Sequence, residues 1–191
     1  INLVITQFAK RPKTKNLFLG ANKHYFPFIS STGCPYSCRE YCTYPTSQGV
    51  KIIRQSNELT IKKLEKVDAN FPRSHVVFRD PVFSINMKET KELLKAIIAS
   101  KLSLNFSAEV HLRNIDDEFI SLCKQAKFTG LKFGIESAIH SVRKSVNRFS
   151  VTNDVQRNKI NQLNASGIKT VGMFILAQPQ DTIETCKKTI K

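Results

Sequence analysis

The sequence has 191 residues, of which 41% are hydrophobic and 24% are charged, and 30 Lys and Arg outnumber 15 Asp and Glu to give a formal net charge of +15. This composition is typical of a folded domain and excludes a disordered chain. No apolar run approaches the roughly 20 residues of a membrane span, and the first residues lack the apolar centre and cleavage site of a secretory signal. We therefore expect a cytoplasmic protein with no membrane span.

Residues 1–25 are basic and weakly patterned, which predicts a lead-in or linker segment with one short strand at residues 2–6. Residues 26–191 form the predicted domain. Because the sequence begins at Ile1 rather than Met, we interpret it as part of a longer protein.

From residue 26 onward, short apolar runs alternate with patterns of helical spacing. In the first predicted helix, Leu59, Ile61, Leu64 and Val67 recur at helical intervals, and Asn57 is its predicted N-cap. Strict alternation of strand and helix predicts an α/β protein with a parallel sheet and right-handed crossovers. The predicted strands are 26–30, 75–80, 104–110, 130–137 and 168–177, and the predicted helices are 57–67, 87–100, 116–126, 153–167 and 181–191.

Two parallel architectures fit this order, an open doubly wound sheet and a barrel, and periodicity does not separate them. In a barrel, functional groups gather at the carboxyl ends of the strands. Polar residues follow all five predicted strands, so one mouth of a barrel could collect them: the cysteines after the first, then Asp80, then Glu109 and Arg113, then Glu136, and finally Gln178.

Three of the five cysteines, Cys34, Cys38 and Cys42, fall within nine residues. An odd number of cysteines with such local clustering suits metal or cluster ligation in a reducing compartment better than disulfides. Structural zinc takes four ligands, and neither His24 nor His75 completes a zinc-finger pattern. An iron–sulfur cluster held by three thiolates, with one iron free for another ligand, fits better. We expect Cys123 and Cys186 to serve in packing.

The stretch STGCPYSCREYCTYPTSQGVKIIRQSNEL, which starts at Ser31, resembles the cluster loop of radical S-adenosylmethionine (SAM) enzymes, and it is most similar to the branch that carries an N-terminal cobalamin-binding domain. Four later stretches are similar to the same branch. They are VVFRDPVFSIN (76–86), FGIES (133–137), Asn147–Arg148 and GMFILAQPQDTIET (172–185). The resemblance covers residues 26–191.

The resemblance implies an enzyme with a (β/α)6 TIM-like barrel of parallel strands, here partial because the last strand and helix unit is missing. It also implies a [4Fe–4S] cluster, SAM, an electron donor such as flavodoxin or ferredoxin, and cobalamin in the full-length protein. Each site residue is then assigned by its position in these motifs. Cys34, Cys38 and Cys42 would bind the cluster, Tyr41 would lie near the adenine, Asp80 would contact the SAM amino group, Glu136 would accept from the ribose or the ammonium, and Arg113 and Arg148 would bind the carboxylate.

The sequence departs from the family pattern at two places. The cysteine spacing is C-x3-C-x3-C, one residue longer than usual, and that residue requires the loop to bulge. Where the family has Gly-x-Pro-Gly, this chain has Ala177, Gln178, Pro179 and Gln180, so side chains replace glycines that allow positive φ or close approach. Residues 1–25 are too short to form a cobalamin domain.

The favoured function is reductive cleavage of SAM to a 5′-deoxyadenosyl radical for C–H functionalisation, such as methylation of a small molecule or peptide. A second hypothesis is RNA modification by the same chemistry, since a charge of +15 attracts a polyanion. The non-enzymatic alternative is a degenerate fragment that keeps the barrel and binds no cluster. The sequence does not specify the substrate.

Overall fold

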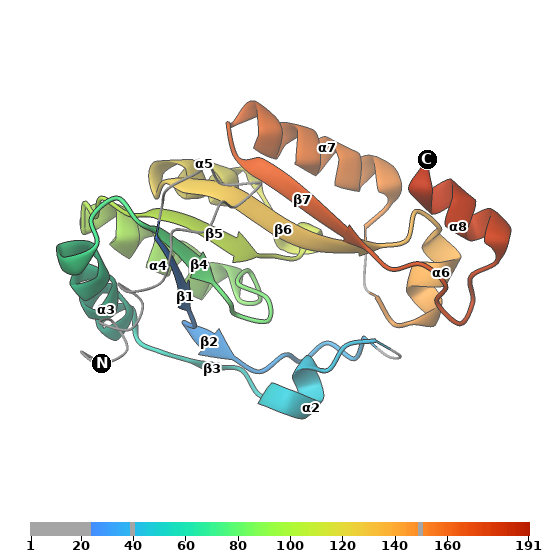
Figure 1. Cartoon of the computed structure of the whole chain (residues 1–191), viewed down its shortest axis with the longest axis horizontal. Coiled ribbons are helices and arrows are strands. Elements are labelled where there is room, and N and C mark those ends of the chain that lie inside the picture. Colours follow the sequence, from blue (N-terminus) through green and yellow to red (C-terminus); the bar gives the residue numbers. More distant parts are fainter. Residues whose placement is uncertain (1–23, 39–40, 149–150) are drawn as a thin grey trace.

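The computed structural model describes residues 24–38, 41–148 and 151–191. The strand expected at residues 2–6 lies outside these ranges, as does most of the lead-in segment. All five predicted strands of the domain are confirmed and form one parallel sheet (Figure 1). In order across the sheet, they are β1 (Tyr25–Phe28), β4 (His75–Phe78), β5 (Asn105–Glu109), β6 (Phe128–Glu136) and β7 (Lys169–Phe174).

The strand order decides between the two parallel architectures. Each strand of the sheet pairs with the next one along the chain, and the order never reverses as it does in a doubly wound sheet. Sequential right-handed crossovers place all connecting helices on one side, as in a barrel. The predicted α/β fold with a partial barrel is therefore confirmed. The main helices are α3 (Asn57–Asn70), α4 (Met87–Ala99), α5 (Asp117–Gln125), α7 (Asn153–Ala165) and α8 (Ile183–Ile190).

Side-chain caps fix where these helices begin. The side chain of Ser56 accepts a hydrogen bond from the Leu59 amide, so Ser56 caps α3, and the prediction that Asn57 is the cap was wrong by one residue. Four further helices begin in the same way, because an oxygen at the N-cap satisfies an amide that has no partner inside the helix. Their caps are Asn86 for α4, Asp116 for α5, Thr152 for α7 and Thr182 for α8.

The hydrophobic core lies between the sheet and the helices on its outer side. Phe78 of β4 packs against Phe83, Phe106 and Phe128, with ring centroids 4.8–6.0 Å apart. Cys123 of α5 is fully buried in this core, as its predicted packing role requires. Burial of aromatic and aliphatic side chains on this side supplies the main driving force for folding.

Several short elements were not predicted, because two to six residues are too few to show periodicity. Two of them, β2 and β3, form a separate antiparallel pair at the base of the cysteine-bearing segment, which lies across the curved sheet from α7 (Figure 1). These elements are β2 (Ser31–Thr32), α2 (Tyr44–Gln48), β3 (Ile53–Arg54), the 3₁₀ turn η1 (Leu112–Asn114) and α6 (His140–Ser145).

The last strand, β7, and the last helix, α8, are the least buried of the main elements in the described part of the chain. β7 pairs with β6 alone and is an edge strand, and no residue of α8 is buried. Ile183 and Ile190 of α8 are 78% and 70% exposed. Among the described residues, no helix has the length and apolar content to cross a membrane.

Candidate functional site

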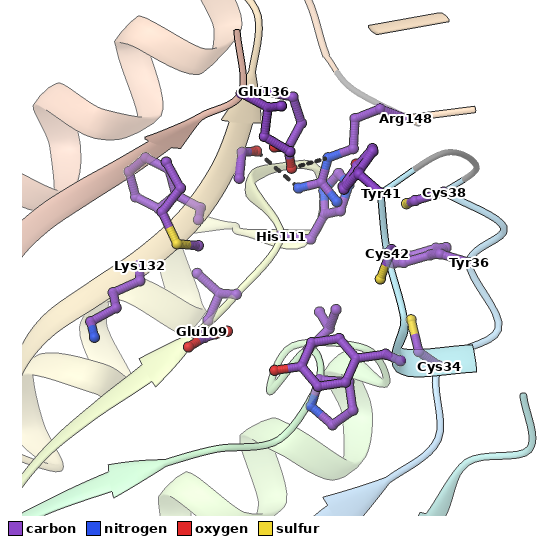
Figure 2. A pocket seen from close by; sticks show the side chains of 18 of the residues that line it. Cys34, Tyr36, Cys38, Tyr41, Cys42, Glu109, His111, Lys132, Glu136 and Arg148 are labelled. Atoms are coloured by element: carbon purple, nitrogen blue, oxygen red, sulfur yellow. Dashed lines mark hydrogen bonds and ion pairs between the residues drawn. The ribbon is translucent and has the colours of Figure 1, made fainter. Parts of the chain in front are cut away.

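A cavity of about 370 Å³ opens at the carboxyl ends of the strands. This size is within the usual range for small-molecule sites. One wall is the segment that carries the three cysteines, and the facing wall is formed by residues at the ends of β5, β6 and β7 (Figure 2). The side chains that matter below are Cys34, Tyr36, Cys38, Tyr41, Cys42, Tyr44, Glu109, His111, Lys132, Gly134, Glu136 and Arg148.

The base of the cysteine segment is closed by backbone contacts. β2 pairs with β3, and the Cys34 amide donates to the carbonyl of Gly49 at 3.0 Å. Gly33 has a φ of +83°, and a Cβ at this position would lie 2.0 Å from the carbonyl oxygen of Lys51. Only glycine therefore allows the chain to turn here and to present Cys34 to the cavity.

Asp80 fastens the start of the same segment to the sheet. Its side chain is fully buried directly after β4. One carboxylate oxygen accepts the amides of Ser30 and Ser31 at 2.6 and 3.0 Å, and the other accepts the Ser30 hydroxyl. A carboxylate with three donors is a strong, fully used acceptor. Asp80 is outside the cavity lining, so the structure places it under the loop rather than in the cavity.

The three thiols line the cavity together, although they do not converge on one point. Cys34 and Cys38 are buried, and Cys42 is half-buried. Burial raises the pKa of the Cys34 thiol, and the hydrogen bond from the Tyr36 amide opposes this shift. Among the described residues, no three His, Cys, Asp or Glu side chains are close enough to share one metal ion. In a cluster held by three cysteines, each thiolate binds a different iron, so the three thiols need not meet at one point.

Glu136 has an unusual backbone conformation at the end of β6. Its φ is +68°, and the pairing of β6 with β7 shifts register between Gly134 and Glu136. A Cβ on Gly134 would lie 2.0 Å from Oε1 of Glu136, so glycine is needed for this carboxylate to fold back along the strand. Left-handed backbone at a non-glycine residue costs about 1–3 kcal/mol and is concentrated at functional sites.

Arg148 and Tyr41 stand beside this carboxylate. Nε of Arg148 lies 3.6 Å from Oε1 of Glu136, and its Nη2 donates to the carbonyl of Gly134 at 2.9 Å. Burial raises the pKa of Glu136, and the Arg148 charge acts in the opposite direction. Burial likewise raises the pKa of Tyr41. A contact with the Tyr41 hydroxyl also lowers the pKa of Glu136. Among the described residues, Nε of Arg148 is buried without a hydrogen-bond partner, as expected where a polar ligand completes a site.

The cavity brings together six of the eight predicted site residues, namely Cys34, Cys38, Cys42, Tyr41, Glu136 and Arg148. Asp80 and Arg113 are not among them. Arg113 lies in η1 with an exposed side chain, outside the cavity lining. Arg39 and Glu40, which lie between Cys38 and Cys42 in the sequence, are outside the described residues.

Sequence reasoning missed His111, which is buried and lines the cavity two residues after the end of β5. Its Nδ1 accepts the Arg113 amide at 3.2 Å, so Nε2 carries the proton of the neutral ring. The Tyr36 ring packs against it, with centroids 5.4 Å apart. The sequence pattern that could have identified His111 is its position just after a predicted strand, as for Glu109 and Glu136.

The two changed glycine positions lie beside the cavity rather than in its lining. Ala177 has a φ of +58°, which is the left-handed conformation that the expected glycine would have adopted. Ala177 and Gln180 are both exposed. Neither side chain is part of the cavity lining.

The model of the radical SAM superfamily matches residues 28–191. The chain belongs to the radical SAM superfamily. An uncharacterized methyltransferase of Pyrococcus horikoshii is 23% identical over 163 residues, which make up 85% of this chain and 35% of that protein. The predicted family is confirmed.

Two solved radical SAM structures have a similar fold. One is the methyltransferase TsrM from Kitasatospora setae with tryptophan and a SAM analogue bound, at a TM-score of 0.78 and 18% identity over 87% of this chain and 33% of that one. The other is the cobalamin-dependent enzyme OxsB with aqua-cobalamin and SAM bound. Its TM-score is 0.71, and it is 18% identical over 86% of this chain and 25% of that one. The chain thus spans about a third or less of these radical SAM proteins, and at this identity the likeness to the solved structures concerns the fold alone.

Proposed function

We propose that this chain is the catalytic core of a radical SAM enzyme that binds a [4Fe–4S] cluster through Cys34, Cys38 and Cys42 and binds SAM beside it. The observation that carries the proposal is the shared cavity, which three thiols and Tyr41 from one segment line together with Glu136 and Arg148. When bound, the cluster supplies the electron that cleaves SAM reductively to methionine and a 5′-deoxyadenosyl radical.

Each polar residue of the cavity has a role in holding SAM that follows from its charge. The guanidinium of Arg148 offers parallel N–H donors to the carboxylate of SAM. Glu136, 3.6 Å from Arg148, accepts from the ammonium group or from a ribose hydroxyl. The Tyr41 ring provides a surface for the adenine. Because both ends of the Glu136–Arg148 pair are nearly buried, each would lose little freedom on binding.

Burial sets the condition under which the thiols can act as ligands. A thiolate is the form that binds iron. Burial raises the pKa of Cys34 and so disfavours the thiolate. Metal binding must therefore displace a proton, so we expect cluster assembly to release protons and to become more favourable as pH rises.

Anaerobic reconstitution with iron and sulfide tests the cluster. We expect a brown protein with about four irons per chain. Cys38→Ala should lose the colour, whereas the matched Cys186→Ala, which changes a half-buried cysteine of α8 outside the cavity lining, should keep it. A folded, colourless wild-type protein, or one that takes up zinc in place of iron, would support the scaffold alternative instead.

Equilibrium binding of SAM to the reconstituted chain tests the pocket. Arg148→Ala should weaken binding by at least about tenfold, because a charge-assisted hydrogen bond contributes roughly 1.5–3 kcal/mol. Arg113→Ala is the matched control and should change the affinity by less than about twofold, because Arg113 lies outside the cavity lining. The reverse order of effects would mean that the carboxylate site has been placed incorrectly. Formation of 5′-deoxyadenosine under a strong reductant then reports activity.

We further propose C–H functionalisation such as methylation as the reaction of the full-length protein, with cobalamin as its second cofactor and a flavodoxin or ferredoxin as its electron donor. Support comes from the methyltransferase of Pyrococcus horikoshii and from the cobalamin-bound OxsB, both named above for their similarity. The net charge of +15 favours RNA as a second substrate class. Steeply salt-dependent RNA binding would support that alternative, and its absence would count against it.

A further inference from the structure

Three charged residues stand side by side at the carboxyl ends of neighbouring strands, and two of them, Glu109 and Lys132, line the wall of the cavity that faces the cysteines. The strand register pairs Glu109 with Lys132, and Arg79 directly follows Phe78, which pairs with Ala108. Adjacent strands therefore carry Arg79, Glu109 and Lys132 at one level of the sheet. Figure 2 shows Glu109 and Lys132 on this wall, across from the three cysteines.

The Glu109 carboxylate already forms an ion pair with one of the two cations, Arg79. Nη1 of Arg79 lies 2.8 Å from Oε1 of Glu109, and the Glu109 side chain is only 18% exposed. No ion pair between described residues involves Lys132, although Lys132 is half-buried and lines the cavity. Lys132 thus presents to the cavity an ammonium group for which the described part of the chain supplies no ion-pair partner.

The surroundings of Lys132 make this charge effective. Pro81, Val82, Val110 and Met173 line the same cavity and are apolar. Apolar walls lower the effective dielectric constant, so an anion beside the ammonium would be attracted more strongly than at an open surface.

We propose that Lys132 binds an anionic group, a carboxylate or a phosphate, of the substrate and that the Arg79–Glu109 ion pair keeps Lys132 available for it. This inference rests on the proposed function, since it assigns the substrate class of that same cavity. The cation of Lys132 and the cysteines lie on facing walls. A substrate held by its anionic group would therefore extend across the cavity toward the proposed cluster and SAM.

Titration with two small anions tests the site without iron or SAM. Benzoate represents a planar carboxylate and methylphosphonate a tetrahedral phosphate, and chloride keeps the ionic strength constant. Lysines are labelled as ¹³C-dimethyllysine, which keeps their charge, and the Lys132 signal is identified by its loss in Lys132→Arg. One of the two anions should move this signal along a saturable curve, and the anion that binds more tightly identifies the group.

Thermal stabilisation by the same anion separates charge from structure. Lys132→Met keeps the length of the side chain and removes its charge, so the affinity should fall by at least about tenfold. Lys132→Arg should retain most of it, and the control Lys62→Met, at an exposed position of α3, should match the wild type. Equal affinity in Lys132→Met and the wild type, or no saturable shift of the Lys132 signal, overturns the inference. A chain that binds the anion and fails to assemble a cluster would contradict the proposed function alone.

Discussion

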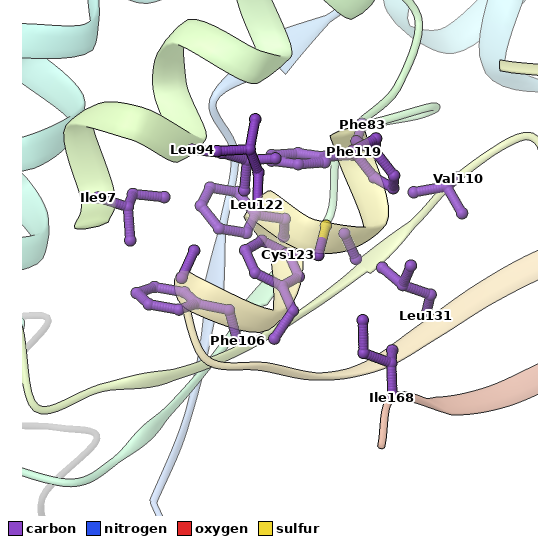
Figure 3. Close-up of a cluster of buried hydrophobic side chains, with 14 of the residues drawn as sticks. Phe83, Leu94, Ile97, Phe106, Val110, Phe119, Leu122, Cys123, Leu131 and Ile168 are labelled. Atoms are coloured by element: carbon purple, nitrogen blue, oxygen red, sulfur yellow. The ribbon is translucent and has the colours of Figure 1, made fainter. Parts of the chain in front are cut away.

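The two faces of the same five strands have opposite chemistry. On the outer face, Phe106 and Leu131 lie against Phe119, Leu122 and Cys123 of α5, and all of them are buried (Figure 3). On the inner face, the neighbouring residues Glu109 and Lys132 line an open cavity. Because successive side chains of a strand point to opposite faces, one short stretch serves both stability and binding. The comparison teaches that changes on the outer face should affect folding and that changes on the inner face should affect ligands.

Phe78→Ala on the outer face should have the largest effect on folding. Phe78 is fully buried and contacts four other aromatic rings, and deleting such a side chain leaves a cavity that costs about 3–5 kcal/mol. Urea denaturation measures the loss in free energy of unfolding. The matched inner-face change, Lys132→Met, should stay within about 1 kcal/mol of the wild type. Similar losses in both variants would contradict the division between the faces.

Asp80→Ala tests the link between the faces, since Asp80 joins the sheet to the cysteine segment. The change leaves the buried donors of Ser30 and Ser31 without an acceptor, and each costs about 1–3 kcal/mol. We expect a loss of about 3 kcal/mol in the free energy of unfolding. Hydrogen exchange should also accelerate in residues 30–38 and not in α5. Exchange that increases evenly over the chain would mean that Asp80 supports the whole fold instead.

Glu136→Gln should change the free energy of unfolding by less than Phe78→Ala or Asp80→Ala, and the size of its effect should depend on pH. Burial raises the pKa of Glu136 above its ordinary 4.5, so the folded state holds this proton more tightly than the unfolded state does. The contribution of the protonated Glu136 side chain to stability is therefore fully present below pH 4.5 and is lost as pH rises through the folded-state pKa. Denaturation midpoints of the wild type and the variant, measured across this interval, should diverge with pH. Parallel curves would show that Arg148 compensates the buried charge completely.

Ala177→Gly should have the smallest effect and the opposite sign. The φ of +58° at Ala177 costs an L-residue about 1–2 kcal/mol, and glycine adopts it without strain. The greater freedom of glycine in the unfolded chain offsets about 0.4–1 kcal/mol of this gain. We therefore expect stabilisation by about 0.5–1 kcal/mol, measured as a rise in melting temperature. Destabilisation would mean that the Ala177 methyl group makes a contact worth more than the strain.

The strands were predictable because each has a run of residues buried among the helices, and alternation with helices left only a parallel order. The small elements β2, β3 and α2 were not predictable. β2 and β3 depend on contacts between residues 20 or more positions apart, such as Ser31 with Arg54, which leave no local pattern. α2 has only five residues, too few to show a helical period. The cap of α3 was misplaced by one residue because both Ser56 and Asn57 are good caps, and only the hydrogen bond to the Leu59 amide decides between them.

The sequence by itself determined the family, the alternating fold and the three clustered cysteines, since these follow from local spacing and motif order. Only the tertiary structure decided which polar residues share the cavity. It placed Asp80 beneath the loop, Arg113 outside the cavity lining, and His111 and Lys132 inside it. The physical reason is that the face on which a residue lies depends on strand register, bulges and backbone angles such as the positive φ of Glu136. A shift of one residue moves a side chain from one face to the other.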